Sequence, residues 1–193
     1  MILSALKNEI FDLIPEGARV LDLGCGNGDL LEVLIREKNV KGYGIEIDFD
    51  SVTTCIQRGI SVYHGDIEEA ITGFSDNAFD VVILSQTLQQ VQHPVYLLHE
   101  ILRIGKQAVV SFPNFAHWHV RLSLFFGVIP KTKSLPFEWY NTPNIRVASI
   151  SGFRQLCKNE GFTITYEGTG TTQLLSNLFC SKGLFILEKA TND

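Results

Sequence analysis

Val20-Leu-Asp-Leu-Gly-Cys-Gly-Asn-Gly28 is the stretch that decides the fold of this 193-residue chain. The apolar run from Arg19 to Leu23 predicts a buried strand, and the glycines at 24, 26 and 28 predict a sharp turn. Apolar residues at helical spacing follow from Leu30. A helix that starts on such a turn aims free N–H groups at the crevice beyond the strand ends, where parallel sheets bind ligands.

Strands and helices alternate along most of the chain, which predicts a Rossmann-like α/β fold with a mostly parallel sheet. Further strands are predicted at 43–47, 60–63, 79–85, 108–112, 162–167 and 183–188. Helices are predicted at 3–14, 51–58, 94–102 and 149–157, the last one stopped by Gly161. Residues 113–148 hold both tryptophans without a clean period, so we expect an irregular cover over one edge of the sheet. We expect one domain over 1–193.

Composition excludes several classes of function. The net charge of −5, without a long basic stretch, argues against general affinity for nucleic acid or anionic membrane. The longest apolar runs are too short to span a bilayer, and the first residues do not read as a signal peptide. The four cysteines lie far apart and form no CxxC pair. We therefore expect reduced thiols in a cytoplasmic protein.

Two features separate the glycine turn from the dinucleotide fingerprint G-x-G-x-x-G. The third glycine comes one position early, and Asp29 stands where the fingerprint has glycine or alanine. The carboxylate of Asp22 also lies inside the strand, two residues before the first glycine. A negative charge there disfavours a pyrophosphate and favours a cationic ligand. S-adenosylmethionine carries an ammonium and a sulfonium group, so it fits this turn. A nicotinamide dinucleotide does not, which argues against a nicotinamide-dependent oxidoreductase.

Two more carboxylates support this interpretation. Glu46 follows Gly26 by 20 residues at the end of the second strand, where it can hold ribose hydroxyls, and Asp66 follows the third strand, where it can accept from an adenine amino group. We interpret Cys25, at a helix start that could lower its pKa, as packing or touching the cofactor rather than reacting. The residues predicted to bind S-adenosylmethionine or S-adenosylhomocysteine are Asp22, Gly24, Cys25, Gly26, Asn27, Gly28, Glu46, Ile47, Asp66, Ile67 and Ser85.

With these motifs the chain resembles the class I S-adenosylmethionine-dependent methyltransferases. The segments Gly42-Tyr-Gly-Ile-Glu-Ile-Asp48, Val82-Ile-Leu-Ser-Gln-Thr-Leu-Gln89, Ser111-Phe-Pro-Asn-Phe115 and Glu138-Trp-Tyr-Asn-Thr-Pro-Asn-Ile145 resemble, more narrowly, the methionine biosynthesis protein MetW family. That resemblance implies a seven-stranded sheet with an antiparallel last strand. It also implies a link to methionine synthesis, in which such proteins accompany a homoserine O-acyltransferase and support its activity.

No catalytic residue is predicted. Many small-molecule methyltransferases that resemble this chain carry a histidine just after the fourth strand, where this chain has Gln90, which cannot take a proton at neutral pH. An Asn/Asp-Pro-Pro-Tyr sequence is absent, which argues against a nucleic-acid methyltransferase. We interpret His93 as part of a helix entrance. His117 and His119 lack an evident third ligand, so no metal site is predicted.

Other polar and aromatic residues remain ambiguous. Glu138, Trp139 and Tyr140 either line an acceptor pocket or pack the cover segment. Four basic residues form either a rim for an acidic acceptor or, as we prefer, scattered surface charge; they are Arg121, Lys131, Lys133 and Arg146. Two functions therefore stay open. The chain is either a cofactor-binding, non-catalytic partner of an acyltransferase or a methyltransferase acting on a small acceptor.

Overall fold

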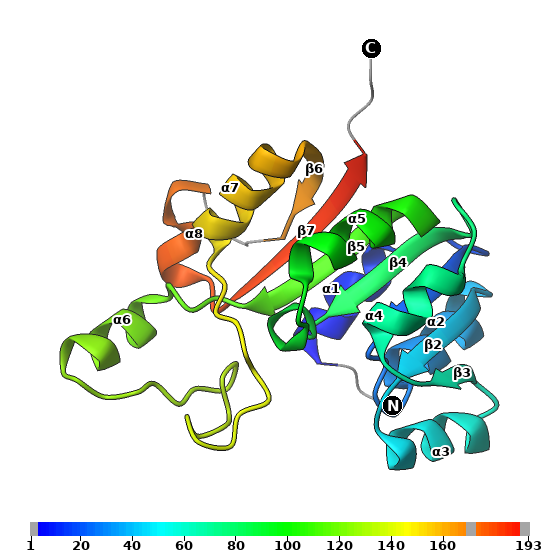
Figure 1. Ribbon diagram of the computed structural model, residues 1–193, viewed down its shortest axis with the longest axis horizontal. Helices are drawn as coiled ribbons and strands as arrows, with labels where there is room; N and C mark the ends of the chain where they lie inside the picture. The colour runs from blue at the N-terminus through cyan, green and yellow to red at the C-terminus, as the bar shows by residue number, and fades with distance from the viewer. Residues whose placement is uncertain (1–3, 169–172, 190–193) are drawn as a thin grey trace. The chain divides into compact units, whose positions relative to one another are not determined.

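The chain is described by a computed structural model that covers residues 4–168 and 173–189 (Figure 1). Its described part divides into two compact units. The first comprises residues 4–85 and 95–109. The second comprises residues 86–94, 110–168 and 173–189. The predicted cofactor residues all fall in the first unit, whereas the predicted cover segment lies in the second.

The strands of the described chain form a seven-stranded sheet in the order β3-β2-β1-β4-β5-β7-β6, with helices on both of its faces (Figure 1). The strands are β1 (Arg19–Leu23), β2 (Lys41–Glu46), β3 (Ser61–His64), β4 (Phe79–Ser85), β5 (Gly105–Pro113), β6 (Phe162–Glu167) and β7 (Lys182–Lys189). The pairs β1–β2, β2–β3 and β1–β4 are parallel, and β6–β7 is antiparallel. The predicted mostly parallel α/β sheet with an antiparallel last strand is confirmed.

Capping residues fix where two of the helices around the first four strands begin. Ser4 caps α1 by accepting from the N–H of Lys7, and Asp48 caps α3 by accepting from Ser51. The helices are α1 (Ala5–Leu13), α2 (Asp29–Lys38), α3 (Phe49–Gln57), α4 (Ile67–Ala70) and α5 (Pro94–Ile104). Leu3, which we placed in the first helix, lies outside the described residues. The short α4 was not predicted, because four residues are too few to display a helical period.

The centre of the first unit is apolar on both faces of β1 and β4. Leu21, Leu23 and Ile83 are completely buried, which is the pattern of a parallel strand covered on both sides. Asp22 interrupts this run and is itself only 5% exposed. It stands in register with Gly44 of β2 and with Ile83 of β4. The fold therefore places one carboxylate deep at the end of its central strands.

The described residues of the second unit form three α-helices: α6 (Trp118–Phe125), α7 (Ile150–Glu160) and α8 (Gln173–Phe179). The rings of Phe112, Phe153 and Phe185 pack against one another, with centroids 4.8–5.8 Å apart. The helix predicted over 149–157 is present as α7, and its predicted stop at Gly161 is confirmed. Ser149 caps its start by accepting from a backbone N–H, and Gly161 ends it at a φ of 72°.

One prediction about this unit was wrong in part. We expected residues 113–148 to be irregular, but they contain the helix α6. Its apolar residues are spread around the helix instead of along one face, because Leu122, Leu124 and Phe125 are exposed while Val120 is buried. A helix without an amphipathic pattern gives no periodic signal in the sequence. Within residues 4–168 and 173–189, no helix has both the length and the apolar character needed to cross a membrane.

Candidate functional site

The glycine turn after β1 takes a backbone conformation that other residues rarely adopt. Gly24, Gly26 and Gly28 have φ values of 77°, 55° and 76°. The N–H groups of Gly24 and Cys25 donate to the carbonyl oxygen of Ile45 at 2.8 and 3.2 Å. The turn is therefore fastened to the end of β2, and α2 begins immediately after Gly28.

The turn is tightly packed on one side and open on the other. A Cβ atom at Gly28 would lie 2.5 Å from Cδ1 of Ile60 and 2.9 Å from Sγ of Cys55. At Gly44, in the neighbouring strand, it would lie 2.6 Å from Sγ of Cys25. A Cβ at Gly26 would meet no atom within 4 Å. A side chain at Gly26 would therefore point into open space.

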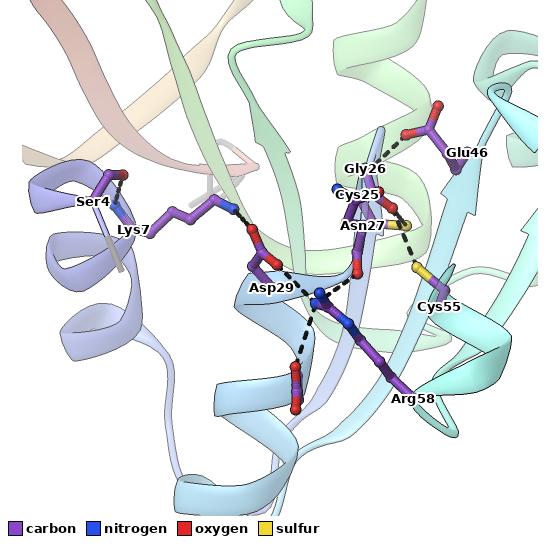
Figure 2. A network of polar contacts seen from close by, with 10 residues as sticks. Ser4, Lys7, Cys25, Gly26, Asn27, Asp29, Glu46, Cys55 and Arg58 are labelled. Carbon is purple, nitrogen blue, oxygen red and sulfur yellow. Dashed lines mark hydrogen bonds and ion pairs between the residues drawn. The ribbon is translucent and has the colours of Figure 1, made fainter. Parts of the chain in front are cut away.

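Glu46 joins the end of β2 to the glycine turn (Figure 2). Its Oε2 accepts from the N–H of Gly26 at 2.7 Å, and its Oε1 accepts from the N–H groups of Ile47 and Asp48, both at 2.9 Å. The side chain is nearly buried. A carboxylate offers about four acceptor positions, so three backbone bonds leave roughly one unused.

Asp22 lies next to this pair and has no hydrogen-bonding partner among the described residues. Burial raises the pKa of Asp22 to about 7, while the nearby charge of Lys7 opposes the rise and that of Glu46 adds to it. A buried carboxylate without a donor is unfavourable unless a ligand supplies one. The site thus contains an acidic group that a cationic ligand would satisfy.

Two further predicted contact residues, Ile47 and Asp66, follow the ends of β2 and β3. Asp66 is the N-cap of α4, and its Oδ1 accepts from the N–H of Glu68 at 2.7 Å, so one of its oxygens already serves the backbone. Gly65, just before it, donates its N–H to the carbonyl of Glu46 at 3.0 Å. Ile47 follows Glu46 directly and exposes 65% of its surface. The ends of β2 and β3 therefore bring Glu46, Ile47 and Asp66 to one edge of the sheet.

Ile67 and Ser85 complete the predicted set. Ile67 is the first residue of α4 and is half-buried, and Ser85 is the last residue of β4. Because β4 pairs with β1 through Ile83 and Asp22, Ser85 ends beside the strand that leads into the turn. Asn27 points its carbonyl oxygen at Arg58, whose Nη1 lies 3.0 Å away.

A charged network that the sequence did not reveal holds the start of α2 (Figure 2). Lys7 of α1 contacts Oδ2 of Asp29 at 3.1 Å, and Arg58, just after α3, contacts its Oδ1 at 2.7 Å. Arg58 also lies 3.3 Å from Glu32. Chiefly because Arg58 donates to it, the pKa of Asp29 is lowered from its usual value. No local motif marks Lys7 or Arg58, since each is more than 20 residues from Asp29.

Cys25 is not activated by its place in the turn. Burial raises the pKa of its thiol above the usual range, and the nearby charge of Asp22 raises it further. The helix start therefore does not lower this pKa, which agrees with the interpretation of Cys25 as a residue that does not react. Cys55 donates from its Sγ to the carbonyl of Gly26 at 3.2 Å. Both thiols pack beneath the turn instead of presenting a nucleophile.

The second unit holds the residues we considered for catalysis. Gln90 ends a short 3-10 helix (Leu88–Gln90), and its Nε2 is 3.5 Å from the carbonyl of Gln86. Gln89, beside it, is buried, and its Oε1 has no hydrogen-bonding partner among the described residues. His93 is exposed just before α5. Among the described residues, no group of three or more His, Cys, Asp or Glu side chains is placed to hold a metal ion.

The second unit contains a cavity of about 200 Å³ beside the residues considered for an acceptor pocket. Glu138 and Trp139 line it together with Phe115, Phe137 and Gln89, whereas Tyr140 does not and exposes 70% of its surface. Two of the four basic residues donate to backbone carbonyl oxygens, and Arg146 also lines this cavity. Arg121 donates to the carbonyl of Ala116 at 2.6 Å, and Arg146 donates to that of Gln92 at 2.8 Å.

Solved structures share this fold. A SAM-dependent methyltransferase from Archaeoglobus fulgidus is 18% identical, with a TM-score of 0.68 and coverage of 95% of this chain and 93% of that one. An S-adenosylmethionine-dependent methyltransferase from Mesorhizobium loti is 14% identical, with a TM-score of 0.68 and coverage of 96% and 99%. The predicted Rossmann-like class is therefore confirmed.

Sequence relatives narrow the family. The bifunctional methionine biosynthesis protein MetXA/MetW of Rhodopirellula baltica is 39% identical over 160 residues, which are 78% of this chain and 26% of that protein. The 2-phytyl-1,4-naphtoquinone methyltransferase of Thermosynechococcus vestitus is 27% identical over 56% of each chain. The chain thus spans between about a quarter and about half of the length of these relatives. Residues 5–187 match the family described as methionine biosynthesis protein MetW. The chain therefore belongs to the MetW family of methionine biosynthesis proteins.

Proposed function

We propose that the first unit binds S-adenosylmethionine or S-adenosylhomocysteine at the glycine turn after β1. The observation that carries this proposal is the carboxylate of Asp22, which is 5% exposed and has no hydrogen-bonding partner among the described residues. The ammonium group of either ligand, and the sulfonium of the first, would supply the missing positive charge. The residues present therefore fit this cofactor.

The geometry of the turn supports the remaining contacts of this proposal. The open space beside Gly26 receives the nucleoside, and Glu46 accepts from the ribose hydroxyls. Two hydroxyls need two acceptor positions, and Glu46 has about one unused. We therefore expect the Gly26 N–H to release Oε2 when ribose binds. Ile47, Asp66, Ile67 and Ser85 then border the adenine.

We assign this chain a role in methionine synthesis: it binds the cofactor and supports a homoserine O-acyltransferase. The relative from Rhodopirellula baltica is named as a bifunctional MetXA/MetW protein, so a MetW-like segment and a second activity occur in one chain there. Linking two modules keeps them at high effective concentration, which favours function as a complex. The present chain would reach the same arrangement by binding its partner as a separate protein.

The second unit offers a surface suited to such a partner. The exposed fractions are 82% for Phe125, 69% for Phe126 and 70% for Trp139. Large apolar side chains gathered on a surface mark interaction sites, and aromatic residues are enriched in interfaces. These side chains would be covered in the complex.

Catalysis by this chain itself is the second candidate function, favoured by the similarity to a naphthoquinone methyltransferase. The cofactor would supply an electrophilic methyl group, with the electrons of the breaking carbon–sulfur bond going to sulfur. The chain's own residues would contribute by holding the acceptor in line with that methyl, because orientation alone can accelerate such a displacement greatly. Gln90 cannot remove a proton at neutral pH, so the acceptor would have to react without a base at that position.

The cofactor proposal is tested by calorimetric titration of the purified chain with S-adenosylhomocysteine. We expect saturable binding to the wild type and at least about tenfold weaker binding to Asp22→Ala. Wild-type affinity in that variant would place the ligand elsewhere. Asp50→Ala, which removes an exposed carboxylate from the first turn of α3, is the matched control.

The two candidate functions are separated by two measurements. Acyl transfer by a homoserine O-acyltransferase is compared with and without the chain, together with co-elution of the two proteins. An unchanged rate and separate elution would overturn the partner assignment. Incubation of the chain alone with methyl-labelled S-adenosylmethionine and a small-molecule extract tests the methyltransferase assignment, which would be overturned by an unlabelled extract.

A further inference from the structure

A second cavity of the second unit, about 400 Å³ in volume, gathers positive charge. The start of α6 and the segment 131–135 both contribute to its lining. Lys131, Lys133 and His119 line it, and so do Thr132 and Ser134, whose side chains carry hydroxyl groups. No carboxylate is among the described side chains of that lining. This stands out in a chain whose net charge is −5.

The two lysines are available to a ligand to different degrees. Nζ of Lys131 lies 2.8 Å from Oε1 of Glu138, which leaves the other ammonium protons free to donate. Lys133 forms no ion pair or hydrogen bond with any described residue. Lys133 therefore carries the uncompensated charge of the cavity.

A hydroxyl donor completes the polar side of the lining. Thr132 and Leu135 exchange backbone hydrogen bonds of 2.9 and 3.1 Å, which fixes the turn that carries Lys133. Oγ1 of Thr132 accepts from the N–H of Leu135 at 3.1 Å, so its own proton remains available for a ligand. The lining thus offers ammonium and hydroxyl donors to an acceptor-rich group.

His117 has a different part in this cavity. Its Nδ1 accepts from the N–H of His119 at 3.3 Å, and the His117 ring also forms a hydrogen bond with the backbone of Phe179. Burial lowers the pKa of His117, so its ring favours the neutral form. It positions the start of α6, whereas the exposed His119 stays free to face a ligand.

The other side of the lining is apolar. Trp118, Val120 and Leu135 form part of it, and Trp118 remains 44% exposed. A site that combines cationic and hydroxyl donors with an aromatic wall suits a ligand that has an anionic head and a short apolar body.

We propose that this cavity binds a small organic anion through its carboxylate or phosphate group. Lys133, Lys131 and His119 hold the charged group, Thr132 donates to it, and Trp118 packs against the rest of the molecule. The site belongs to the second unit alone, so it stands or falls independently of the cofactor proposal.

The test uses Trp118 as an internal reporter. The chain has two tryptophans, so Trp139→Phe leaves Trp118 as the single indole. We titrate this variant, without cofactor, with sodium phosphate, sodium succinate and sodium chloride at constant ionic strength. We expect a saturable fluorescence change with phosphate or succinate and none with chloride. The anion that saturates at the lower concentration identifies the head group as phosphate or carboxylate.

Charge variants then locate the binding. Lys133→Gln should weaken the apparent affinity at least about tenfold, because it removes a charge-assisted hydrogen bond. Lys131→Gln combined with Lys133→Gln should abolish saturation. Lys158→Gln, an exposed lysine of α7 outside the cavity, is the matched control and should bind as the parent does.

Two results would overturn the proposal. One is the absence of saturable change with either anion, together with the absence of calorimetric heat beyond dilution. The other is equal weakening in Lys158→Gln and Lys133→Gln, which would mean that the anions respond only to net charge.

Discussion

Oε2 of Glu46 accepts a hydrogen bond of 2.7 Å from the N–H of Gly26, which lies 20 residues earlier in the chain. The bond joins the end of β2 to the turn after β1, and two more backbone N–H groups bind the other oxygen of the same carboxylate. The fold therefore orients the carboxylate that we propose to bind ribose, and the two bonds to Ile47 and Asp48 can stay in place when Gly26 releases Oε2. Such preorganisation lowers the entropy lost on binding.

Replacing Glu46 should affect both binding and stability. Glu46→Ala removes the proposed ribose acceptor, which should weaken affinity for S-adenosylhomocysteine by about ten- to a hundredfold. It also leaves three backbone N–H groups without their acceptor, so the free energy of unfolding should fall by roughly 1–3 kcal/mol. Calorimetry and urea unfolding measure the two effects.

A near-isosteric change separates these effects further. In Glu46→Gln, the amide oxygen can keep the bonds to Ile47 and Asp48, while the amide –NH₂ faces the N–H of Gly26, donor against donor. We expect a smaller loss of stability than in the alanine variant and a comparable loss of affinity. Glu37→Ala, on the exposed side of α2, should change neither. Full affinity in Glu46→Gln would show that ribose does not use this carboxylate.

Asp22 should make the ligand-free protein less stable as the pH rises. Its pKa in the fold is about 7, against an ordinary value of 3.8. Between these values the folded protein keeps a proton that the unfolded chain has lost, so the free energy of unfolding falls as the pH rises from about 4 to about 7. The gap corresponds to at most about 4 kcal/mol.

Asp22→Asn should remove this loss of stability at high pH. We expect the variant to unfold at a higher Tm than the wild type at about pH 8 and at nearly the same Tm at about pH 4, measured without ligand by calorimetry. Its affinity for S-adenosylhomocysteine should nevertheless be lower, because the buried charge that attracts the ammonium group is gone. A variant with wild-type stability at both pH values would contradict a raised pKa at Asp22.

The sequence predicts the first unit well because its signals are local. The strand 19–23, the three glycines and the carboxylates at strand ends lie within short motifs, and the alternation of strands and helices fixes the sheet class. The boundaries of α7 follow in the same way, from a serine cap and a glycine stop. In each case the residues that determine the structure are neighbours in the chain.

What the sequence could not supply are relationships between distant residues. Arg58 and Lys7 meet at Asp29 only after three helices have packed together, and no spacing rule connects them. Lys131 and Lys133 looked like scattered charge, but the fold places them on the same cavity as His119. The raised pKa of the Cys25 thiol, likewise, results from burial, which a motif does not encode.

Alanine substitutions at two glycines separate the effect of filling the proposed nucleoside space from the effect of backbone strain. Gly26 and Gly17 have φ values of 55° and 70°, and a Cβ on either would meet no atom within 4 Å. Gly26→Ala and Gly17→Ala should therefore each lower the free energy of unfolding by about 1–2 kcal/mol through strain alone. Only Gly26→Ala should weaken binding of S-adenosylhomocysteine. Equal affinities in both variants, measured by calorimetry, would remove the nucleoside from the space beside Gly26.

Arg58 tests the network that the sequence did not reveal. Arg58→Gln removes the contacts to Asp29 and to the carbonyl of Asn27, so the turn should be held less firmly. Because solvent screens this ion pair, we expect only a small loss of stability, together with a several-fold loss of cofactor affinity. Arg36→Gln, which removes an exposed arginine paired with its neighbour Glu37, should leave affinity unchanged. High salt should lower the cofactor affinity of the wild type toward that of the variant, since exposed ion pairs are screened.

The exposed aromatic residues of the second unit should carry the partner contact. Phe125→Ser with Phe126→Ser removes two large apolar side chains that are 82% and 69% exposed, so the isolated chain should keep its Tm within about 2 °C. Each truncation of an aromatic anchor can remove about 2 kcal/mol or more from an interface, so the complex with a homoserine O-acyltransferase should weaken at least about thirtyfold. Ile56→Ser, which removes an apolar side chain 64% exposed on α3, is the matched control and should co-elute as the wild type does. If the double variant co-elutes and supports acyl transfer normally, the partner binds through another surface of the protein.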